Sequence, residues 1–240
     1  MRRIPPIDWN GTVGIMLMLV MLPCILKSQD STRFFDSKNR QVLYTASLSS
    51  AVLFTGAFLA DQPLREGVQL NHSSMGDAVS QYTNYLGDKR LVLSLNGALL
   101  ATGYLVDDPG LFRTSWNAAK SVFSTAVLTE GLKHTFGRSR PYTENGPRHF
   151  NSFPPNRHAF KSLPSGHTSL AFAFFTPFAE KYSRWLYILP VSAGAARIYK
   201  DKHWASDVVL GAAIGFFTGY FFQHKNQHLE VSFNRIVVRF

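Results

Sequence analysis

Cysteine is nearly absent from this sequence: Cys24 is the only one in 240 residues. A single cysteine excludes an intrachain disulfide framework and a cysteine-based zinc site. Acidic residues are also few, since 15 Asp and Glu stand against 25 Lys and Arg and leave a formal charge of +10. This excess of cations favours an anionic substrate or partner, and phosphate groups, nucleic acids and acidic lipids are all candidates.

Charge is missing altogether from residues 9–26, an apolar stretch that follows two N-terminal arginines. Such a segment is typical of an export signal or a membrane anchor, and we assign residues 1–28 to it. Its removal stays open, because no small-x-small cleavage site follows and Pro23 precedes Cys24, where a lipoprotein signal needs a small residue.

Long β-branched runs are also few in the rest of the chain. Six segments of low charge and frequent small residues exceed the usual strand length, which predicts helices. They are residues 42–60, 91–106, 115–136, 166–179, 185–198 and 204–222. The sequence therefore predicts an all-α fold, a bundle of about six helices in addition to the N-terminal apolar helix. Only residues 42–60 approach the roughly 20 residues of a membrane span. The mean hydropathy is −0.04. A soluble bundle and a membrane bundle both stay open.

The last residues of the chain differ from the bundle in pattern. Residues 229–240 alternate apolar and polar side chains, as a strand does. We therefore divide the chain into a helical domain at residues 29–225 and a short extended tail at 226–240. The sequence does not identify a pairing partner for this tail.

A long proline-rich connection joins two of the predicted helices at residues 138–163. Structureless loops of this length are uncommon in compact domains unless they form lids or binding surfaces, although a tolerated insertion is the alternative. Besides Arg138 and Arg140 at its start, the connection carries five further basic residues, namely Arg148, His149, Arg157, His158 and Lys161. We interpret it as a functional loop.

The first cluster of polar residues closes the helix predicted at 115–136. Lys133, Arg138 and Arg140 lie at its end, and Pro141 stops it. Cations at a helix C-terminus also complement the helix dipole, so this cluster alone does not indicate a ligand.

The second cluster, Pro164-Ser165-Gly166-His167, begins the next helix. Ser165 is well placed as an N-cap, and Gly166 allows a ligand to approach the backbone closely. The free N–H groups of a helix start form a favourable anion site. An ordinary capped helix with an exposed histidine is the alternative.

The third cluster contains Arg197, His203 and Asp207. His203 and Asp207 are four residues apart, so on a helix they share one face and can form a side-chain hydrogen bond. An Asp that accepts from one imidazole nitrogen leaves the other free for attack. A metal site built from both residues and His167 is the alternative, but the nearby Lys and Arg side chains would repel a cation.

Together the clusters resemble the three-part signature of the type 2 phosphatidic acid phosphatase and vanadium haloperoxidase superfamily. The matching motifs are Lys133-x6-Arg140-Pro141, Pro164-Ser165-Gly166-His167 and Arg197-x5-His203-x3-Asp207. The resemblance covers about residues 90–223, and it places the chain among the acid and lipid phosphatases of bacteria. One departure is Ala196, because the family usually has serine before this arginine.

The resemblance implies a metal-independent phosphatase with no cofactor. Lys133, Arg140 and Arg197 would hold the phosphoryl oxygens, and the backbone N–H groups of Ser165 and Gly166 would complete the pocket. Phosphoryl transfer needs mainly positioning and charge neutralisation, which long cations and a helix start supply.

The resemblance also implies the reacting groups. His203 would attack phosphorus and form a phosphohistidine, oriented by Asp207, while His167 would protonate the leaving oxygen. One imidazole must be neutral and the other protonated, so we expect a bell-shaped pH profile of activity.

The expected substrate is a lipid phosphate or an isoprenoid diphosphate, hydrolysed at a bacterial cell membrane or in the periplasm with the site facing outside the cytoplasm. A soluble nonspecific acid phosphatase is the alternative, followed by a vanadate-dependent haloperoxidase and a non-enzymatic anion-binding protein. Nucleic acid is not an expected partner, because the cations gather at three helix boundaries and form no stripe with interleaved aromatics.

Overall fold

The computed structural model describes residues 35–153, 158–225, 229–232 and 235–238. The predicted all-α bundle is confirmed, whereas the predicted N-terminal signal or anchor lies outside the described residues. The helices are α2 (Ser37–Leu70), α3 (Ser74–Tyr85), α4 (Lys89–Leu105), α5 (Pro109–Phe136), α6 (Gly166–Lys181), α7 (Ile188–Tyr199) and α8 (Ala205–His224). Strands β1 (Leu229–Ser232) and β2 (Arg235–Val238) follow.

Local sequence signals set where these helices begin and end. The carboxylates of Asp36, Asp88 and Asp108 accept from backbone N–H groups in the first turns of α2, α4 and α5. Such N-caps satisfy donors that have no partner within the helix. At the other end of α5, Gly137 takes a left-handed conformation with φ 54° and stops the helix. The chain therefore leaves α5 about one turn after Lys133 and turns back toward α6.

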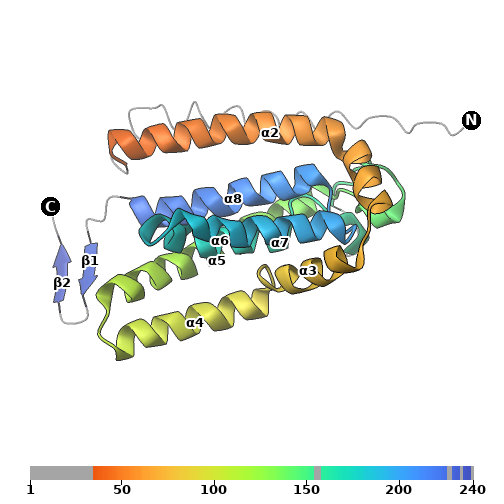
Figure 1. Cartoon of the computed structure of the whole chain (residues 1–240). Coiled ribbons are helices and arrows are strands. Elements are labelled where there is room, and N and C mark those ends of the chain that lie inside the picture. Colours follow the sequence, from red (N-terminus) through yellow and green to blue (C-terminus); the bar gives the residue numbers. More distant parts are fainter. Residues whose placement is uncertain (1–34, 154–157, 226–228, 233–234, 239–240) are drawn as a thin grey trace, which may run out of the picture.

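Helix α6 lies at the centre of the bundle and packs against α5, α7 and α8 (Figure 1). Its core side chains are aromatic and small, and they include Phe174, Phe175, Phe178, Ala171 and Ala173. Gly211 on α8 lets the two backbones approach closely, since a Cβ atom there would lie 2.6 Å from the Ser165 carbonyl oxygen. This close approach brings the starts of α6 and α8 together.

Two parts of the fold go beyond the prediction. Helix α3 was not predicted, because its sequence is short and polar; Ser73 as N-cap and Asp77 in the first turn were the available signals. The extended tail is confirmed and forms an antiparallel hairpin in which Leu229 pairs with Val238. The tail thus supplies its own pairing partner, which projects from one end of the bundle (Figure 1).

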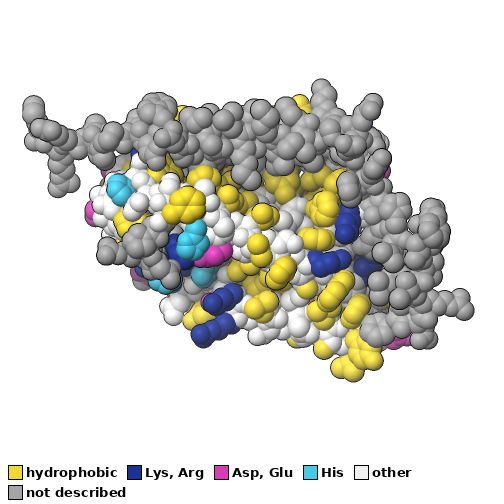
Figure 2. Space-filling view, turned by 180° about the vertical axis from the view of Figure 1, so that it is seen from behind, with side chains coloured by type: hydrophobic (Ala, Val, Ile, Leu, Met, Phe, Trp, Pro, Cys, Tyr) yellow, Lys and Arg dark blue, Asp and Glu magenta, His cyan; other side chains and the backbone are white. Residues whose placement is uncertain are grey.

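Helices α2 and α8 are long and apolar enough to cross a membrane, judged by length and composition among the described residues. In the apolar window of α2 only 17% of the residues are buried, against 50% in α8. Large apolar side chains are exposed on α2, α4 and α5, among them Val52, Leu53, Leu59, Leu93, Phe123 and Val127. Figure 2 shows such hydrophobic side chains spread across the middle of one face.

Candidate active site

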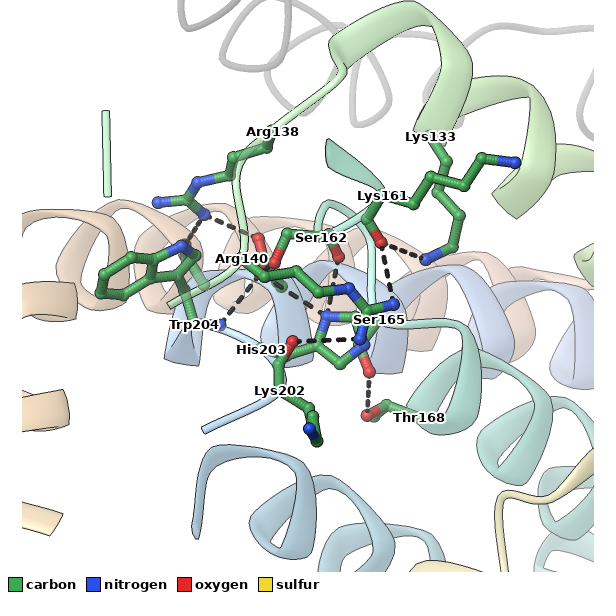
Figure 3. A network of polar contacts seen from close by, with 12 residues as sticks. Lys133, Arg138, Arg140, Lys161, Ser162, Ser165, Thr168, Lys202, His203 and Trp204 are labelled. Atoms are coloured by element: carbon green, nitrogen blue, oxygen red, sulfur yellow. Dashed lines mark hydrogen bonds and ion pairs between the residues drawn. The ribbon is translucent and has the colours of Figure 1, made fainter. Parts of the chain in front are cut away.

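The three sequence clusters meet at one end of the bundle, where α5 and α7 end and α6 and α8 begin (Figure 3). Lys133 Nζ and an Arg140 terminal nitrogen both donate to the carbonyl oxygen of Lys161, at 2.9 and 3.4 Å. The other terminal nitrogen of Arg140 lies 3.5 Å from the carbonyl oxygen of Lys202, the neighbour of His203. The long loop therefore joins the first cluster to the third.

Three cations of this site lack acidic partners. Lys133, Arg140 and Arg197 are all largely buried, yet none forms an ion pair with a carboxylate of the described residues. The Nε atoms of Arg140 and Arg197 are buried without a hydrogen-bond acceptor in that part of the chain. Burial and the charge of Arg140 lower the pKa of Lys133 to about 7. A bound anion would satisfy these donors and restore the charge on Lys133.

The start of α6 faces Lys133. A Cβ atom at Gly166 would lie 3.5 Å from Lys133 Cε and 3.8 Å from its Nζ, so the ammonium group lies against the first turn of the helix. Gly166 is the first residue of α6, and its N–H group has no acceptor within the helix. This arrangement fits the predicted contribution of Gly166 to an anion site.

Ser165 differs from its prediction. Its backbone N–H donates to the carbonyl oxygen of Asp207 at 2.9 Å and is therefore not free for a phosphate oxygen. Its hydroxyl group lies 2.9 Å from the Thr168 hydroxyl group, and Ser165 is fully buried. The expectation of a free backbone donor at Ser165 is thus wrong, because the close packing of α6 on α8 uses this donor to join the two helix starts.

The imidazole of His203 is oriented by a backbone carbonyl. Nδ1 lies 2.8 Å from the carbonyl oxygen of Ser162 but 3.7 Å from the nearer Asp207 oxygen. At 3.7 Å the Asp207 carboxylate lies within ion-pair range of Nδ1 but beyond hydrogen-bond distance, so the Ser162 carbonyl is the acceptor. His203 precedes α8, which begins at Ala205, so the two residues do not share a helical face as predicted. A carbonyl oxygen only accepts, so Nδ1 carries the proton and Nε2 keeps its lone pair.

The surroundings of His203 favour the neutral imidazole. Its side chain is 2% exposed, and burial lowers its pKa well below the ordinary value for histidine. Asp207 acts on His203 through neighbouring residues. Its carboxylate accepts from the Ser162 hydroxyl at 2.5 Å and from the backbone N–H of Trp204 at 2.9 Å. Asp207 thus fixes the residues on both sides of the imidazole.

His167 lies in the first turn of α6, and its imidazole has no hydrogen-bond partner among the described residues. Burial and the charge of Arg197 lower its pKa to about 4. The turn between α3 and α4 packs on its backbone, because a Cβ at Gly87 would lie 2.5 Å from the His167 carbonyl oxygen. The structure thus fixes the backbone of His167 and leaves its imidazole free to exchange a proton.

Several contributing residues were not predicted. Asn84, at the end of α3, accepts from Arg197 at 2.5 Å and so orients this cation. Ser162 was not predicted because it acts on His203 through its carbonyl group, which the sequence does not distinguish. Arg138 was placed in the first cluster beside Lys133 and Arg140 without a role in the pocket, and it points away from both, toward Trp204 (Figure 3).

Comparison with known proteins agrees with this geometry. A family model described as the PAP2 superfamily matches residues 114–229. The lipid A 1-phosphatase of Rhizobium etli is 34% identical over 218 residues, which cover 88% of this chain and 82% of that protein. The chain belongs to the PAP2 superfamily. The sequence-based identification is confirmed, and a phosphatase is the enzyme class that PAP2 membership supports.

Other PAP2 relatives match over shorter lengths. The lipid A 1-phosphatase of Porphyromonas gingivalis is 41% identical over 94 residues, which cover 36% of this chain and 18% of that protein. The lipid A 1-phosphatase of Rhizobium johnstonii is 34% identical over 108 residues, 42% of this chain and 44% of that protein. The chain therefore spans less than half the length of these two relatives.

Two solved structures share the fold. LpxE from Aquifex aeolicus superposes with a TM-score of 0.53 at 23% identity, over 66% of this chain and 92% of that one. A transmembrane PAP2-type phosphatidylglycerolphosphate phosphatase from Bacillus subtilis gives 0.51 at 18% identity, over 88% and 94%. At these identities the superpositions establish the PAP2 fold alone.

Proposed function

We propose that the protein hydrolyses the phosphate ester of a membrane lipid through a phosphohistidine, without a metal ion. The observation that carries the proposal is the fixed His203 imidazole, with Nδ1 bound to a carbonyl oxygen, beside cations whose donors lack acidic partners. The names of three relatives, all lipid A 1-phosphatases, direct the substrate class toward a phosphorylated lipid of the lipid A type.

The chemical steps follow from the two histidines. The lone pair of His203 Nε2 attacks phosphorus, a nitrogen–phosphorus bond forms, and the bond from phosphorus to the ester oxygen breaks. That oxygen takes a proton from His167 and leaves as the alcohol. Water then attacks phosphorus and gives a proton to His167, and the nitrogen–phosphorus bond breaks to release phosphate. Each histidine returns to its starting state.

The cations of the pocket stabilise the transition state. Charge spreads over three equatorial oxygens as phosphorus is transferred, and donors held in place before the reaction cost no reorganisation. Lys133, Arg140 and Arg197 supply these donors together with the first turn of α6. An anion beside His167 also raises the pKa of this imidazole from about 4, so the substrate itself favours the protonated acid.

The outer surface supports a lipid substrate over a soluble one. Exposed apolar side chains on α2, including Val52 and Leu59 at 72% and 66%, are suited to contact with lipid. The apolar stretch at residues 9–26 supports a protein whose site faces outside the cytoplasm. We therefore propose a membrane location for the enzyme.

A substrate panel tests the proposal. Membranes that contain wild-type protein are assayed with lipid A, phosphatidate, phosphatidylglycerol phosphate, an isoprenoid diphosphate and a soluble aryl phosphate, with chelator present. We expect phosphate release to be fastest from a lipid, and His203→Gln to lower the rate by at least about 1,000-fold. His224→Gln, at the far end of α8, is the matched control and should retain activity.

The same assay contains the contrary outcomes. Equal rates on the aryl phosphate and on the dispersed lipids would favour the nonspecific acid phosphatase. Loss of activity on adding chelator would show that a metal ion takes part. Full activity of His203→Gln would show that His203 is not the nucleophile.

A further inference from the structure

A fully buried arginine lies beneath the phosphate pocket. Arg138 is 0% exposed, and all five of its N–H donors have acceptors. One terminal nitrogen donates to Asp207 and the Ser206 hydroxyl, both at 2.7 Å, and the other to Asp61 at 2.7 Å and the Pro147 carbonyl at 2.6 Å. The guanidinium group thus bridges two carboxylates.

The second carboxylate comes from a different part of the chain. Asp61 lies on α2, outside residues 114–229, and is 1% exposed. Besides Arg138 it accepts from the backbone N–H of Ser206 at 2.9 Å and from the Ser206 hydroxyl at 2.5 Å. Helix α2 is therefore bonded directly to the first turn of α8, which carries Asp207.

The bridge determines how Asp207 is used. Arg138 donates to Oδ1 of Asp207. The other carboxylate oxygen, Oδ2, therefore accepts both from the Ser162 hydroxyl and from the backbone N–H of Trp204. The carbonyl of Ser162 then orients His203. A continuous set of hydrogen bonds thus runs from Asp61 on α2 to the imidazole.

Charge gives this connection a second consequence. The bonds from Arg138 and from both donors of Ser206 favour the ionised form of Asp61; with both carboxylates ionised, the two carboxylates and the guanidinium carry a net charge of −1 beneath His203. When Nε2 attacks phosphorus while Nδ1 keeps its proton, the imidazole ring becomes positively charged. A buried negative charge stabilises such a cation more strongly than the same charge in water. Asp61 supplies the carboxylate that makes the cluster negative instead of neutral.

We propose that Asp61 is a positioning residue for the reaction: through Arg138 and Asp207 it fixes the His203 imidazole, and its charge stabilises the ring once it is positive. This inference rests on the proposed function, in which His203 is the nucleophile. It extends the functional site to a helix that lies outside the family-matched segment.

Asp61→Asn tests the proposal with little change in shape. We expect kcat to fall by about 10- to 100-fold, as for outer partners that orient metal-bound imidazoles, because Asp61 acts on His203 through other residues, with KM changed by less than about threefold. The acid limb of the kcat/KM profile should move to lower pH, because loss of an anion disfavours the protonated imidazole.

The direction of this movement separates the proposal from a structural role. If Asp61 only held α2 in place, its loss would let water reach His203 and would move the acid limb to higher pH. Movement to higher pH, or an unchanged profile, would overturn the proposal. Thr125→Val serves as the matched control, because Thr125 is equally buried and bonds Thr218 at 2.6 Å between α5 and α8. Its profile should be that of the wild type.

A second variant covers the case in which Asp61→Asn does not fold. Ser162→Ala removes the hydroxyl that donates to Asp207 and keeps the carbonyl that faces His203. We expect a fall in kcat of about tenfold, with slower formation of acid-labile phosphohistidine in rapid-quench experiments. A wild-type rate would overturn the proposal. Inactive His203→Gln beside a fully active Asp61→Asn would reject this inference and keep the proposed function.

Discussion

Arg138 and Arg140 are two residues apart in the sequence, and they belong to opposite regions of the site. All five N–H donors of Arg138 have acceptors, and two of these acceptors are carboxylates. Arg140 has only two backbone carbonyls at 3.4 and 3.5 Å, and its Nε has no acceptor within the described chain. The first arginine is satisfied by the protein, while the second keeps donors that a phosphate can use.

The comparison has energetic consequences. Removal of one member of a buried ion pair leaves an uncompensated charge, which is strongly destabilising. Removal of a buried cation that has no acidic partner relieves a desolvation cost. Loss of one member of the lower cluster, Arg138 with its two carboxylates, therefore costs stability, whereas the phosphate pocket is held at some expense of stability.

The largest expected effect is a difference in stability between variants of the two arginines. Arg138→Met should lower the free energy of unfolding by about 3–5 kcal/mol, because Asp61 and Asp207 stay buried without their cation. Arg140→Met should leave the melting temperature unchanged or raise it, while kcat/KM falls at least about 100-fold. Thermal unfolding of both variants in detergent, followed by activity assays, measures the difference. Equal losses of stability would show that the two arginines have the same role.

A smaller effect concerns protons. Because His167 has a pKa of about 4 in the free protein, it is neutral at pH 5.5, and a bound dianion should raise this pKa and draw in a proton. Calorimetric titration with sulfate at pH 5.5, in buffers of different ionisation enthalpy, should show uptake approaching about one proton. Lys133, with a pKa of about 7, is already protonated at that pH.

The matched variants assign this proton. His167→Gln should abolish the uptake, and His203→Gln should retain it. Uptake that survives in His167→Gln would contradict the assignment of His167 as the proton donor. In activity assays the same change in pKa predicts that kcat falls as the pH rises above the pKa of His167 in the enzyme–substrate complex, which lies above the value of about 4 in the free enzyme.

The smallest effect concerns a third arginine. Arg65, near the end of α2, pairs with Asp201 at 2.7 Å and with Glu144 at 2.6 Å, but the Glu144 side chain is 74% exposed. Such pairs near the surface contribute little, so Arg65→Gln should lower the free energy of unfolding by less than about 1 kcal/mol. Its kcat/KM should stay within about threefold of the wild type. If Arg65→Gln lowered the free energy of unfolding as much as Arg138→Met, Arg65 would contribute to stability as a buried ion-pair residue does.

The sequence predicted the helices and the composition of the pocket well. The six predicted segments correspond to α2 and to α4 through α8, because their low charge and small residues mark buried or lipid-facing helices. Lys133, Arg140, Gly166 and His203 meet at one end of the bundle because each follows or precedes a helix end that the local residues determine.

The remaining features depend on contacts between distant residues or on backbone groups. The Ser162 carbonyl that orients His203 belongs to a residue type with no special pattern, and the N–H of Ser165 is used by a helix far along the chain. Asp61 gave one signal, a carboxylate directly after the apolar residues 42–60, but its partner Arg138 is 77 positions away. Only the fold shows which arginine each carboxylate meets.

The bond between Asp61 and Arg138 also restricts how this chain can change over evolutionary time. A guanidinium group stays charged at any pH that a cell meets, so a substitution at Asp61 removes a charge that Arg138 cannot adjust to. A substitution at Arg138 leaves the carboxylates of Asp61 and Asp207 buried without the cation that lies between them. Neither position can drift alone without loss, and we expect the two to be exchanged together or not at all. A helix outside the motif-bearing segment is in this way inherited as part of the site.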